Sequence, residues 1–352
     1  MTRQTTSARV RPARVLRRVL GYPARVAMDK IATRIANATA AREAFQHEAS
    51  INAIAHALNT TVAHVSDVAR ALADAQTAAI TSASVDKGTQ MLLSLNYKEL
   101  LARGAVLPSF DDVEFKAYSQ TGEDGLLLYV FALIGTTNKV CVEICAGDGI
   151  ECNCANLLIN HGWTGLLFDG SRENVERGRI FYSTLRHVMV WPPKFVDTWI
   201  SAESINGLIA GNGVSGEIDL LSIDIDGVDY WLWKAIDVVR PRVVIVEYEN
   251  SWGPDRAMSR PNRTDYVGVG KEGKLPLAGA SLAAFVKLAR GKGYRLVGCN
   301  RLCFNAIFVR DDLGVDALPE VSPTRCFTHP MAQTSIAMHQ PTEWTDQEWV
   351  EV

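Results

Sequence analysis

The sequence predicts an α/β protein with a doubly wound, mainly parallel sheet and an antiparallel edge, preceded by a long N-terminal helix. Between about residues 115 and 312, short apolar segments alternate with helix-like segments, a pattern typical of a parallel sheet with helices on both faces. The last two apolar segments have no helix between them, so they form an antiparallel pair. Residues 35–85 contain no Pro or Gly and are rich in Ala, which favours one long helix.

Residues 1–34 are strongly basic, with nine Lys and Arg against the single acid Asp29. Their charge of +8 leaves −11 for the rest of a chain whose total is −3. We predict a flexible basic tail that includes a short helix over Ala13–Leu20. The alternative is a segment that contacts an anionic membrane surface or an acidic partner. The acidic remainder argues against specific binding of nucleic acid, because nucleic-acid binders need a basic face.

The helical region over residues 35–90 carries an apolar seam that advances in alternating steps of three and four residues. The seam consists of Ile51, Ile54, Leu58, Val65, Val68, Leu72, Ala75 and Ala79, with Thr61 as its one polar position. Roughly four heptads of this kind predict a coiled coil, and therefore a homo-oligomer formed through this helix. The alternative is a single amphipathic helix packed on the body of the protein.

Seven short apolar segments are the predicted strands: Lys139–Cys145, Gly165–Asp169, His187–Val190, Asp219–Asp224, Arg242–Glu247, Tyr294–Val297 and Asn305–Val309. The predicted helices between them include Cys154–Asn160, Arg172–Leu185, Tyr230–Val238 and Ala280–Arg290. After residue 312 the chain becomes polar and is interrupted by Pro, so residues 313–352 are predicted to form a C-terminal tail along the surface.

Composition indicates the cellular location of the protein and the oxidation state of its cysteines. No apolar run approaches the roughly 18 residues that indicate a membrane span, and no apolar core precedes a secretory cleavage site. Seven cysteines, an odd number, fit reduced thiols better than a disulfide framework. Cys145, Cys152 and Cys154 lack the paired C-x-x-C spacing of a zinc site. We predict a cytoplasmic protein, with peripheral attachment at the inner membrane surface as an alternative.

A glycine loop follows the first predicted strand, with the sequence Glu143-Ile144-Cys145-Ala146-Gly147-Asp148-Gly149. Glycines at this edge of a parallel sheet let the backbone approach a ligand; the alternative is a plain structural turn. The third glycine of the NAD-binding pattern falls on Cys152, which disfavours an NAD enzyme. The second strand ends at Asp169, 20 residues beyond Gly149, where a carboxylate accepts hydrogen bonds from ribose hydroxyls. Alternatively, Asp169 caps the following helix.

Four acids fall at the ends of two further strands. Asp224 and Asp226 end the fourth strand, and Glu247 and Glu249 end the fifth. Acids that converge on one sheet edge repel one another unless a cation or a proton relieves them. These four residues are therefore the predicted ligands of a divalent cation such as Mg²⁺, with a general base as the other interpretation. The alternative is that most of them cap helices or pair with Arg240, Arg242 or Lys234.

Together these segments resemble the FkbM-type branch of the S-adenosylmethionine-dependent methyltransferases. The resemblance covers about residues 117–311, in the family's order, and nothing before residue 90 shares it. The matching stretches are Ser119 to Gly125, Val142 to Gly149, Glu151-Cys152-Asn153, Gly162-Trp163, Phe168-Asp169-Gly170, Ser222 to Gly227, Asp229-Tyr230-Trp231, Glu247-Tyr248, Gly279 to Leu282 and Gly293-Tyr294.

The resemblance implies a class I, Rossmann-like methyltransferase domain over residues 115–312 that uses S-adenosylmethionine. It implies that residues 120–124 close over the cofactor, that the glycine loop lines its methionine side and that Asp169 binds its ribose. The cofactor-binding residues so predicted are Gln120, Glu123, Asp124, Glu143, Gly147, Asp148, Gly149, Asn153, Asp169 and Gly170. The chain departs from the family pattern at Cys145, Val228, Glu249 and Cys303, where Gly, Asn, Asn and Gly are expected.

The predicted function is transfer of a methyl group to a hydroxyl of a sugar or natural-product acceptor. Such a reaction needs the acceptor held in line with the methyl group and a base or metal ion to take the hydroxyl proton. Asp224 and Asp226 are the predicted catalytic residues. Two other functions stay open: a catalytically silent scaffold assembled by its helix, and an NAD-dependent oxidoreductase.

Overall fold

A computed structural model describes residues 22–83, 85–263, 279–338 and 349–352 of the chain. The chain divides into two units, Met1–Gln76 and Thr77–Val352, which are described separately. The short helix predicted over Ala13–Leu20 lies outside the described residues. Among the described residues, no helix is both long enough and apolar enough to cross a membrane.

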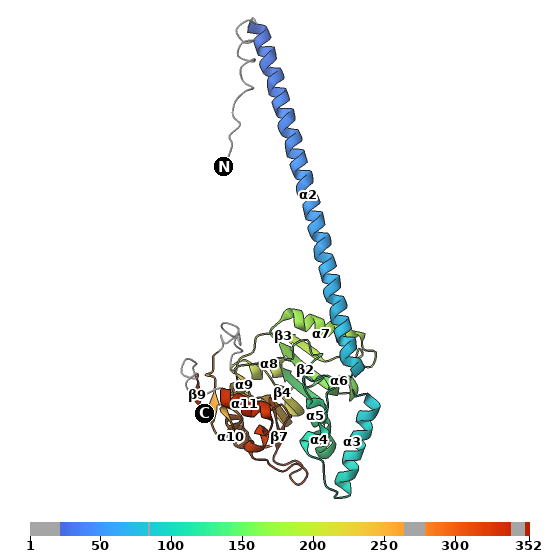
Figure 1. Cartoon of the computed structure of the whole chain (residues 1–352), viewed down its shortest axis with the longest axis vertical. Coiled ribbons are helices and arrows are strands. Elements are labelled where there is room, and N and C mark those ends of the chain that lie inside the picture. The colour runs from blue at the N-terminus through green and yellow to red at the C-terminus, as the bar shows by residue number, and fades with distance from the viewer. Residues whose placement is uncertain (1–21, 84, 264–278, 339–348) are drawn as a thin grey trace. The chain divides into compact units, whose positions relative to one another are not determined.

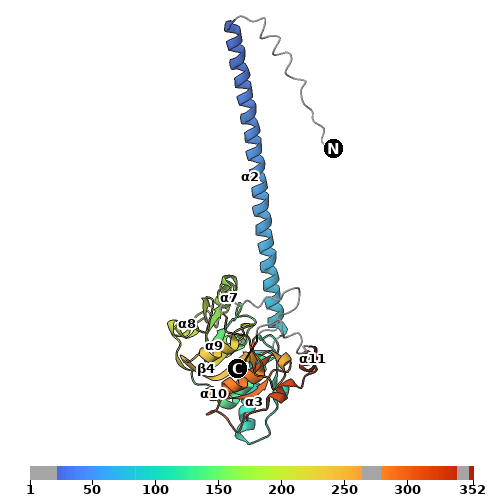
Figure 2. The same ribbon diagram turned by 90° about the vertical axis from the view of Figure 1, so that its left-hand side faces the viewer.

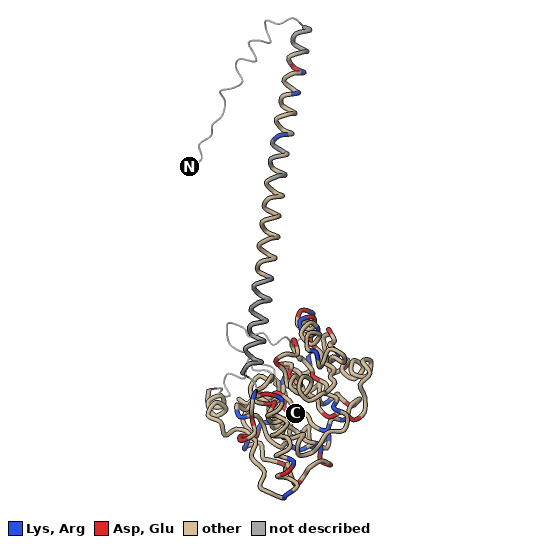
Figure 3. The backbone as a smooth tube through the Cα atoms, turned by 90° about the vertical axis from the view of Figure 1, so that its right-hand side faces the viewer, with Lys and Arg blue, Asp and Glu red and all other residues tan. Residues whose placement is uncertain are grey.

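Helix α2 spans Tyr22–Ala83 and accounts for the first unit. It begins well before residue 35, so the basic segment that was predicted to be flexible is helical from Tyr22 onwards. Its described side chains carry few charges (Figure 3), and residues 49–66 contain no Lys, Arg, Asp or Glu. Large apolar side chains on this stretch remain in solvent: Ile51, Ile54, Leu58, Val62 and Val65 are each more than half exposed.

The second unit is built on a seven-stranded sheet with the order β3-β2-β1-β4-β5-β8-β7 (Figure 1). Its strands are β1 (Val140–Ile144), β2 (Thr164–Asp169), β3 (Lys194–Asp197), β4 (Gly216–Ile223), β5 (Val239–Glu247), β7 (Tyr294–Cys299) and β8 (Asn305–Arg310). Strands β1 to β5 are parallel, and β8 runs antiparallel to both β5 and β7. The predicted α/β fold with an antiparallel edge is confirmed.

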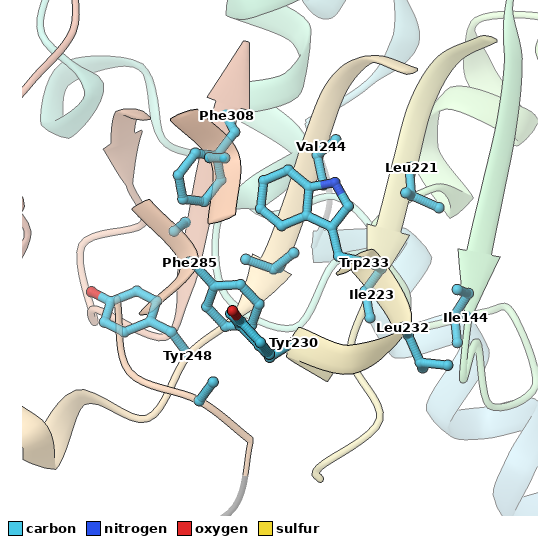
Figure 4. Packing of buried hydrophobic residues seen from close by; sticks show 14 of the residues in the cluster. Ile144, Leu221, Ile223, Tyr230, Leu232, Trp233, Val244, Tyr248, Phe285 and Phe308 are labelled. Carbon is cyan, nitrogen blue, oxygen red and sulfur yellow. The ribbon is translucent and has the colours of Figure 1, made fainter. Parts of the chain in front are cut away.

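Helices cover both faces of this sheet. One face carries α8 (Ile205–Gly211), α9 (Asp229–Ala235) and α10 (Leu282–Lys292) (Figure 2). The other face carries α3 (Lys87–Ala102), α5 (Glu123–Ile134), α6 (Ala155–Asn160) and α7 (Arg172–Thr184). On the first face, Trp233 of α9 packs among Val244, Phe285 and Phe308, with its ring 5.1 Å from that of Phe308 (Figure 4). Burial of these large apolar groups is the main force that holds α9 and α10 on the sheet.

Helices α3 and α5 are two of the helices of this unit that were not predicted. Helix α5 is buried on nearly every side, so its sequence is almost uniformly apolar and lacks the 3.6-residue period of a surface helix. Helix α3, whose N-cap is Asp86, packs against α5 through Tyr97, with ring centroids of Tyr97 and Tyr129 4.9 Å apart. The folded unit therefore includes elements that begin before residue 115.

The strand predicted at His187–Val190 is wrong, because this segment is a turn in which Val188 alone is buried. The third strand is β3, after Pro192 and Pro193. It is only four residues long, and Phe195 alone is fully buried, so no apolar run marks it. The predicted surface tail, residues 313–352, contains α11 (Pro330–Met338) and β9 (Val350–Glu351), which pairs with β6 (Met258–Ser259). It also contributes Phe327 to the core.

Candidate active site

The loop after β1 places three residues with left-handed backbone at the carboxyl edge of the sheet. Cys145, Gly147 and Gly149 have φ angles of 65°, 58° and 68°. A Cβ added to Gly149 would lie 2.7 Å from the Phe195 ring, so close packing requires glycine here. A Cβ added to Gly147 would meet no atom within 4 Å. The loop is therefore packed against the body at Gly149 and borders open space at Gly147.

Asp169 lies at the end of β2, beside this loop, and is 6% exposed. Its Oδ2 accepts a hydrogen bond from the Gly147 N–H at 2.8 Å. Its Oδ1 accepts from the Ser171 N–H at 2.8 Å and from Asn174 Nδ2 at 3.2 Å. Ser171 itself caps α7, because its hydroxyl accepts from the Asn174 N–H. The Asp169 carboxylate therefore joins the glycine loop to the start of α7 without being the helix cap.

Gly149→Ala is expected to destabilise the fold more than Gly147→Ala. Both substitutions place a side chain at a left-handed φ, at a cost of about 1–2 kcal/mol. Only Gly149→Ala also drives a methyl group into Phe195, and such overpacking typically adds about 1–3 kcal/mol. Urea unfolding of the two variants measures the difference, and equal stabilities would contradict the packing at Gly149. Gly147→Ala should be the variant that retains its fold and weakens cofactor binding.

Two residues that the sequence reasoning missed stand beside Asp169. Asp197, at the end of β3, is its partner in the register of the sheet. Trp199 is 58% exposed, and a Cβ added to Gly170 would lie 3.1 Å from its ring, so the ring lies over Gly170. An accessible indole and a second carboxylate next to Asp169 suit the base and the sugar of a nucleoside. If the sequence analysis had placed the third strand at Lys194–Asp197, the end of this strand would have indicated both residues.

Glu143, predicted near the methionine part of the cofactor, and Asn153, predicted to bind the cofactor, are both buried. Glu143 Oε1 accepts from the Asn153 N–H at 2.9 Å and from Ser222 Oγ at 3.1 Å, and its Oε2 accepts from the next backbone N–H at 2.8 Å. Asn153 Nδ2 donates to Ser222 Oγ at 3.1 Å. These bonds fasten the start of α6 to β1 and β4. Asp148 lies closer to the surface, in an ion pair with Arg177 at 3.3 Å.

The segment before α5 is organised by Asp124, which is 1% exposed. Its Oδ2 accepts from the backbone N–H groups of Ala117, Tyr118 and Ser119, at 2.6–2.7 Å, and from Ser119 Oγ at 2.9 Å. Its Oδ1 is buried without a hydrogen-bond partner among the described residues. Burial raises the pKa of Asp124 to about 6 in spite of the four donors to Oδ2. This carboxylate therefore fixes the turn that presents residues 119–122.

Glu123, the neighbour of Asp124, is fully buried. Its hydrogen bonds connect this segment to β8 and to the turn between β7 and β8. It accepts from the Thr121 N–H at 3.1 Å, from Asn300 Nδ2 at 2.9 Å and from Asn305 Nδ2 at 3.0 Å. Burial alone would raise the pKa of Glu123, but hydrogen bonds from the Thr121 hydroxyl, from the backbone N–H groups of Glu123 and Gly122 and from the Asn305 side chain outweigh it, and the pKa is lowered. The side chain of Gln120, by contrast, is exposed. Asn300 and Asn305 lie around a turn without a recognisable motif, so sequence reasoning did not identify them.

Three of the four predicted metal ligands come together at the carboxyl ends of β4 and β5. Asp224, Asp226 and Glu247 have carboxylate oxygens within 4.8 Å of one another. Glu249 is not among them: its side chain accepts from the N–H and hydroxyl of Ser251 and caps a short 3₁₀ turn. Glu249 directly precedes the 3₁₀ turn Asn250–Trp252, and its side chain is engaged in capping that turn and does not join Glu247.

The two arginines considered as alternative partners of these acids form ion pairs with other residues. Arg242 pairs with Asp219 at 3.1 Å, and Arg240 pairs with Asp312 at 3.8 Å. Both arginines belong to the amino half of β5, at the edge of the sheet opposite Glu247. Within the described part of the chain, the ion pairs of lysine and arginine side chains involve other acids than these three.

Burial and mutual repulsion shift the proton affinities of this acid group. Burial, Asp229 and Asp226 raise the pKa of Asp224 to about 7, although a hydrogen bond with Glu247 opposes the shift. Burial, Asp224 and Asp226 raise the pKa of Glu247 to about 11. At neutral pH, Glu247 therefore keeps its proton and Asp224 is the carboxyl that changes state. In the absence of a cation, the proton on Glu247 reduces the electrostatic repulsion among the three acids.

Asp229, at the start of α9, fixes the loop that carries Asp224 and Asp226. Its Oδ1 accepts from the Ile225 N–H at 2.8 Å and its Oδ2 from the Gly227 N–H at 2.9 Å. Between these two donors, Asp226 takes a left-handed φ of 55°, which a non-glycine residue adopts only when its surroundings hold it there. Asp229 is therefore a positioning residue that the sequence reasoning did not assign.

Glu247→Gln is expected to raise thermal stability at high pH and to have little effect near pH 5. A carboxyl whose pKa is higher in the folded chain contributes stability at low pH, and this stability is lost as the pH rises from its ordinary value of 4.5 toward the folded value. A glutamine in its place has no proton to lose. At pH 8 to 9 we expect a gain of at least about 2–4 °C in melting temperature, the equivalent of 1 kcal/mol.

Calorimetric melting at pH 5, 7 and 9 measures this gain. Glu249→Gln is the matched control, because Glu249 lies on the same edge but outside the acid group, and it should retain the wild-type pH dependence. A melting temperature of Glu247→Gln that follows the wild type at every pH would show that Glu247 is not forced to hold a proton.

The strand order defines the class of fold. Ligands of open parallel sheets bind at the carboxyl edge where the strand order reverses, which here lies between β1 and β4. The glycine loop, Asp169 and the acid group all lie along this edge. The second unit is thus a doubly wound α/β domain whose candidate site occupies the expected crevice.

Solved structures with a similar fold include several methyltransferases. The N-terminal domain of EvdMO1, solved in the presence of S-adenosylhomocysteine and D-fucose, is 13% identical, covers 64% of this chain and 97% of its own, and has a TM-score of 0.36. Magnesium protoporphyrin IX methyltransferase from Synechocystis PCC 6803 is 15% identical over 53% and 77%, with a TM-score of 0.33. The CcbJ methyltransferase from Streptomyces caelestis is 12% identical over 52% and 93%, with a TM-score of 0.34.

This likeness is distant and assigns neither cofactor nor substrate to the chain. No protein-family model matches the sequence, and no curated protein matches it.

Proposed function

We propose that the protein transfers a methyl group from S-adenosylmethionine to a hydroxyl of a sugar or natural-product acceptor. The observation that carries this proposal is the arrangement along one sheet edge: a glycine loop open at Gly147, a buried carboxylate at Asp169, and three convergent acids a strand or two away. The first two features suit a nucleoside with a flexible tail, and the third suits removal of a proton from an acceptor. The sequence resemblance to the FkbM-type family agrees with this assignment.

On the cofactor side, Asp169 would accept hydrogen bonds from the ribose hydroxyls, and the indole of Trp199 would pack against the adenine. The methionine part would run past Gly147 toward the segment held by Glu123 and Asp124. Because those two carboxylates are engaged with the chain itself, they would act by shaping the segment. The exposed side chain of Gln120 is the one in this segment that would reach the cofactor.

On the acceptor side, Asp224 is the residue we assign to take the hydroxyl proton. Its raised pKa, about 7, matches the requirement for a base that must be free at neutral pH and still hold a proton afterwards. Asp226 and Glu247 would complete, with Asp224, a set of three hard oxygen ligands. Such a set fits Mg²⁺, and a bound dication would relieve the repulsion in the group and favour loss of the acceptor proton.

Thermal shift with S-adenosylhomocysteine, NAD⁺ and buffer alone tests the cofactor assignment. A ligand that binds only the folded chain raises the melting temperature, by an amount equivalent to about 2.7 kcal/mol at a hundredfold excess over its dissociation constant. We expect a shift with S-adenosylhomocysteine and none with NAD⁺. The reverse result would favour the oxidoreductase, and a silent scaffold is excluded only by turnover.

We also propose that α2 assembles the chain into a homo-oligomer. Ile51, Ile54, Leu58 and Val65 are each more than half exposed, and they follow the three- and four-residue steps of a coiled-coil seam. Most helical stability in proteins comes from packing of an apolar face, so the exposed apolar stripe along Tyr22–Ala83 favours a partner helix. A second copy of the chain supplies an identical stripe, and no charges on residues 49–66 oppose the pairing.

Removal of residues 1–84 is expected to leave a soluble monomer that still binds the cofactor. The cut must precede Asp86, because this residue caps α3 and the buried Gln90 side chain accepts a hydrogen bond from Asn156. Light scattering of the full chain and the truncated chain measures the number of subunits. Ile54→Lys with Leu58→Lys in the full chain is the matched control, since it keeps the length and removes the seam. An unchanged number of subunits after truncation would show that α2 does not assemble the chain.

A further inference from the structure

The turn between α7 and β3 presents a row of large apolar side chains to solvent. Met189, Val190 and Trp191 are 52%, 85% and 74% exposed. Apolar residues scattered singly over a surface are ordinary, whereas three in succession at one turn indicate a contact site. These three residues are called the apolar tip below.

The fold holds the apolar tip in place. Val188, which precedes it, is 6% exposed and belongs to the core on this face of the sheet. The N–H groups of Val188 and Met189 donate to the Leu185 carbonyl at 2.9 and 2.8 Å. The N–H of Trp191 donates to the Val188 carbonyl at 2.9 Å. The exposure of the three side chains is therefore a property of a hydrogen-bonded turn that is anchored in the core.

Two cations flank the apolar tip. Arg186 precedes it and Lys194 follows it, and both side chains are exposed. From residue 177 to residue 196 the chain contains four Lys and Arg and no Asp or Glu. Two of these cations, Arg177 and Arg179, pair with acids outside this stretch. Arg186 and Lys194 therefore give the tip a positive surround.

The indole of the apolar tip and one of the cations lie against the same hollow. Trp191 and Lys194 both line a cavity of 370 Å³. Among the lining residues of this cavity, the acid is Glu217, which forms an ion pair with Arg310 at 2.8 Å. The positive charge of Lys194 beside the indole is therefore available to an anionic partner.

We propose that the apolar tip and its two flanking cations form a contact surface for a membrane that contains anionic phospholipid. Trp favours the headgroup level of a bilayer, and the apolar side chains beside it enter the boundary with the acyl chains. Arg186 and Lys194 lie where they contact lipid phosphates. A standard protein–protein interface takes about 20–30 residues from each partner. Three protruding residues are too few for such an interface and suit insertion into a bilayer.

This contact surface is separate from the candidate active site. Lys194 begins β3, at the amino edge of the sheet, and Asp197 ends the same strand beside Asp169. A membrane bound at the apolar tip therefore leaves the crevice at the carboxyl edge uncovered. The inference does not depend on the proposed methyl transfer.

Sedimentation of the full-length protein with lipid vesicles tests the proposal. We expect binding to phosphatidylcholine vesicles with about one third phosphatidylglycerol, and little binding to pure phosphatidylcholine, because the cations need anionic lipid. Val190→Ser with Trp191→Ser should weaken binding by roughly tenfold or more, through loss of the inserted apolar surface. Arg186→Gln with Lys194→Gln should weaken it by roughly tenfold. Melting temperatures should stay at the wild-type value, since the replaced side chains are exposed.

Val315→Ser with Met338→Ser is the matched control, because these two apolar side chains are 53% and 70% exposed outside the apolar tip. It should bind vesicles as the wild type does. Acyl chains that carry bromine give a local readout, since they quench the fluorescence of Trp that enters the bilayer, and residues 1–34 contain no Trp. Trp191→Phe keeps an apolar side chain, so it should still bind and lose this quenching.

Wild-type protein that stays in solution beside the anionic vesicles would overturn the proposal. So would tip variants that bind as tightly as the wild type, or quenching that is equal in Trp191→Phe. All variants retain residues 1–34, so the basic segment cannot account for a loss of binding. A Val190→Ser, Trp191→Ser chain with fewer subunits by light scattering and unchanged vesicle binding would assign the apolar tip to a second copy of the chain instead.

Discussion

Asp224→Asn is expected to lower the rate of methyl transfer by roughly 10²–10⁴-fold, the usual contribution of a general base. The amide keeps the shape of the side chain and cannot accept the acceptor proton. It also removes one of three oxygen ligands from the acid group. The rate is measured with labelled S-adenosylmethionine and an acceptor found by screening hydroxylated sugars and natural products.

The pH dependence of the wild-type rate of methyl transfer should reflect the titration of Asp224. A base acts in its deprotonated form, so the rate should rise with pH and level off above about 7, the pKa to which burial and neighbouring acids raise Asp224. Asp237→Asn is the control, because Asp237 is exposed and precedes the amino end of β5. Affinity for S-adenosylhomocysteine should stay within about twofold of wild type in both variants. A wild-type rate in Asp224→Asn would remove this residue from the mechanism.

A chelator separates the two ways in which the acid group would act. If a divalent cation completes the site, EDTA abolishes turnover, and Asp226→Asn raises the concentration of Mg²⁺ needed to restore it. If Asp224 acts as a base alone, turnover continues in EDTA and depends on pH as described above. Metal binding by calorimetry distinguishes the cases without an acceptor: the dication should bind to the wild type and not to Asp224→Asn.

Asp169→Ala is expected to weaken binding of S-adenosylhomocysteine by about 1.5–3 kcal/mol, the contribution of hydrogen bonds to a charged group. This corresponds to roughly 10- to 150-fold in dissociation constant. Part of the loss should come from the loop, since the Asp169 carboxylate also holds the Gly147 N–H at 2.8 Å. Isothermal calorimetry measures the affinity.

Asp169→Asn separates the contribution of the negative charge from that of the hydrogen bond to the glycine loop. The amide oxygen can still accept from a backbone N–H, so this variant should keep the loop and lose mainly the charge. We expect an affinity between those of the wild type and Asp169→Ala. If Asp169→Ala binds as tightly as the wild type, the ribose is held elsewhere.

Much of the fold could be read from the sequence because it rests on strong local patterns. The buried parts of strands β1, β2, β4 and β5 are mostly apolar, as expected of strands buried on both faces. The pair β7 and β8, with no helix between them, could form only an antiparallel connection. The convergence of Asp224, Asp226 and Glu247 followed from these strands, because parallel neighbours end at the same edge.

The remaining elements depend on tertiary contacts that leave no periodic trace. Helix α5 is surrounded by the sheet and α3, so it has no polar face to reveal its period. Strand β3 lies at the edge of the sheet, is four residues long and has a single fully buried side chain, and the turn before it was mistaken for the strand. Glu249 was misplaced because its side chain caps the 3₁₀ turn that begins at the next residue. Asn300 donates hydrogen bonds to Thr121 and Glu123, and Asp229 accepts from the N–H groups of Ile225 and Gly227. Hydrogen bonds of this kind have no sequence signature.

Transfer of a labelled methyl group from S-adenosylmethionine to a hydroxylated acceptor tests the central claim most directly. The purified chain is incubated with labelled cofactor and a panel of sugars and natural-product alcohols, and the products are separated by mass. We expect one class of acceptor to gain a methyl group on oxygen, with stoichiometric formation of S-adenosylhomocysteine and loss of both products in Asp224→Asn. A chain that binds S-adenosylhomocysteine and methylates no member of the panel, or that forms methylated product equally well as Asp224→Asn, would contradict the claim.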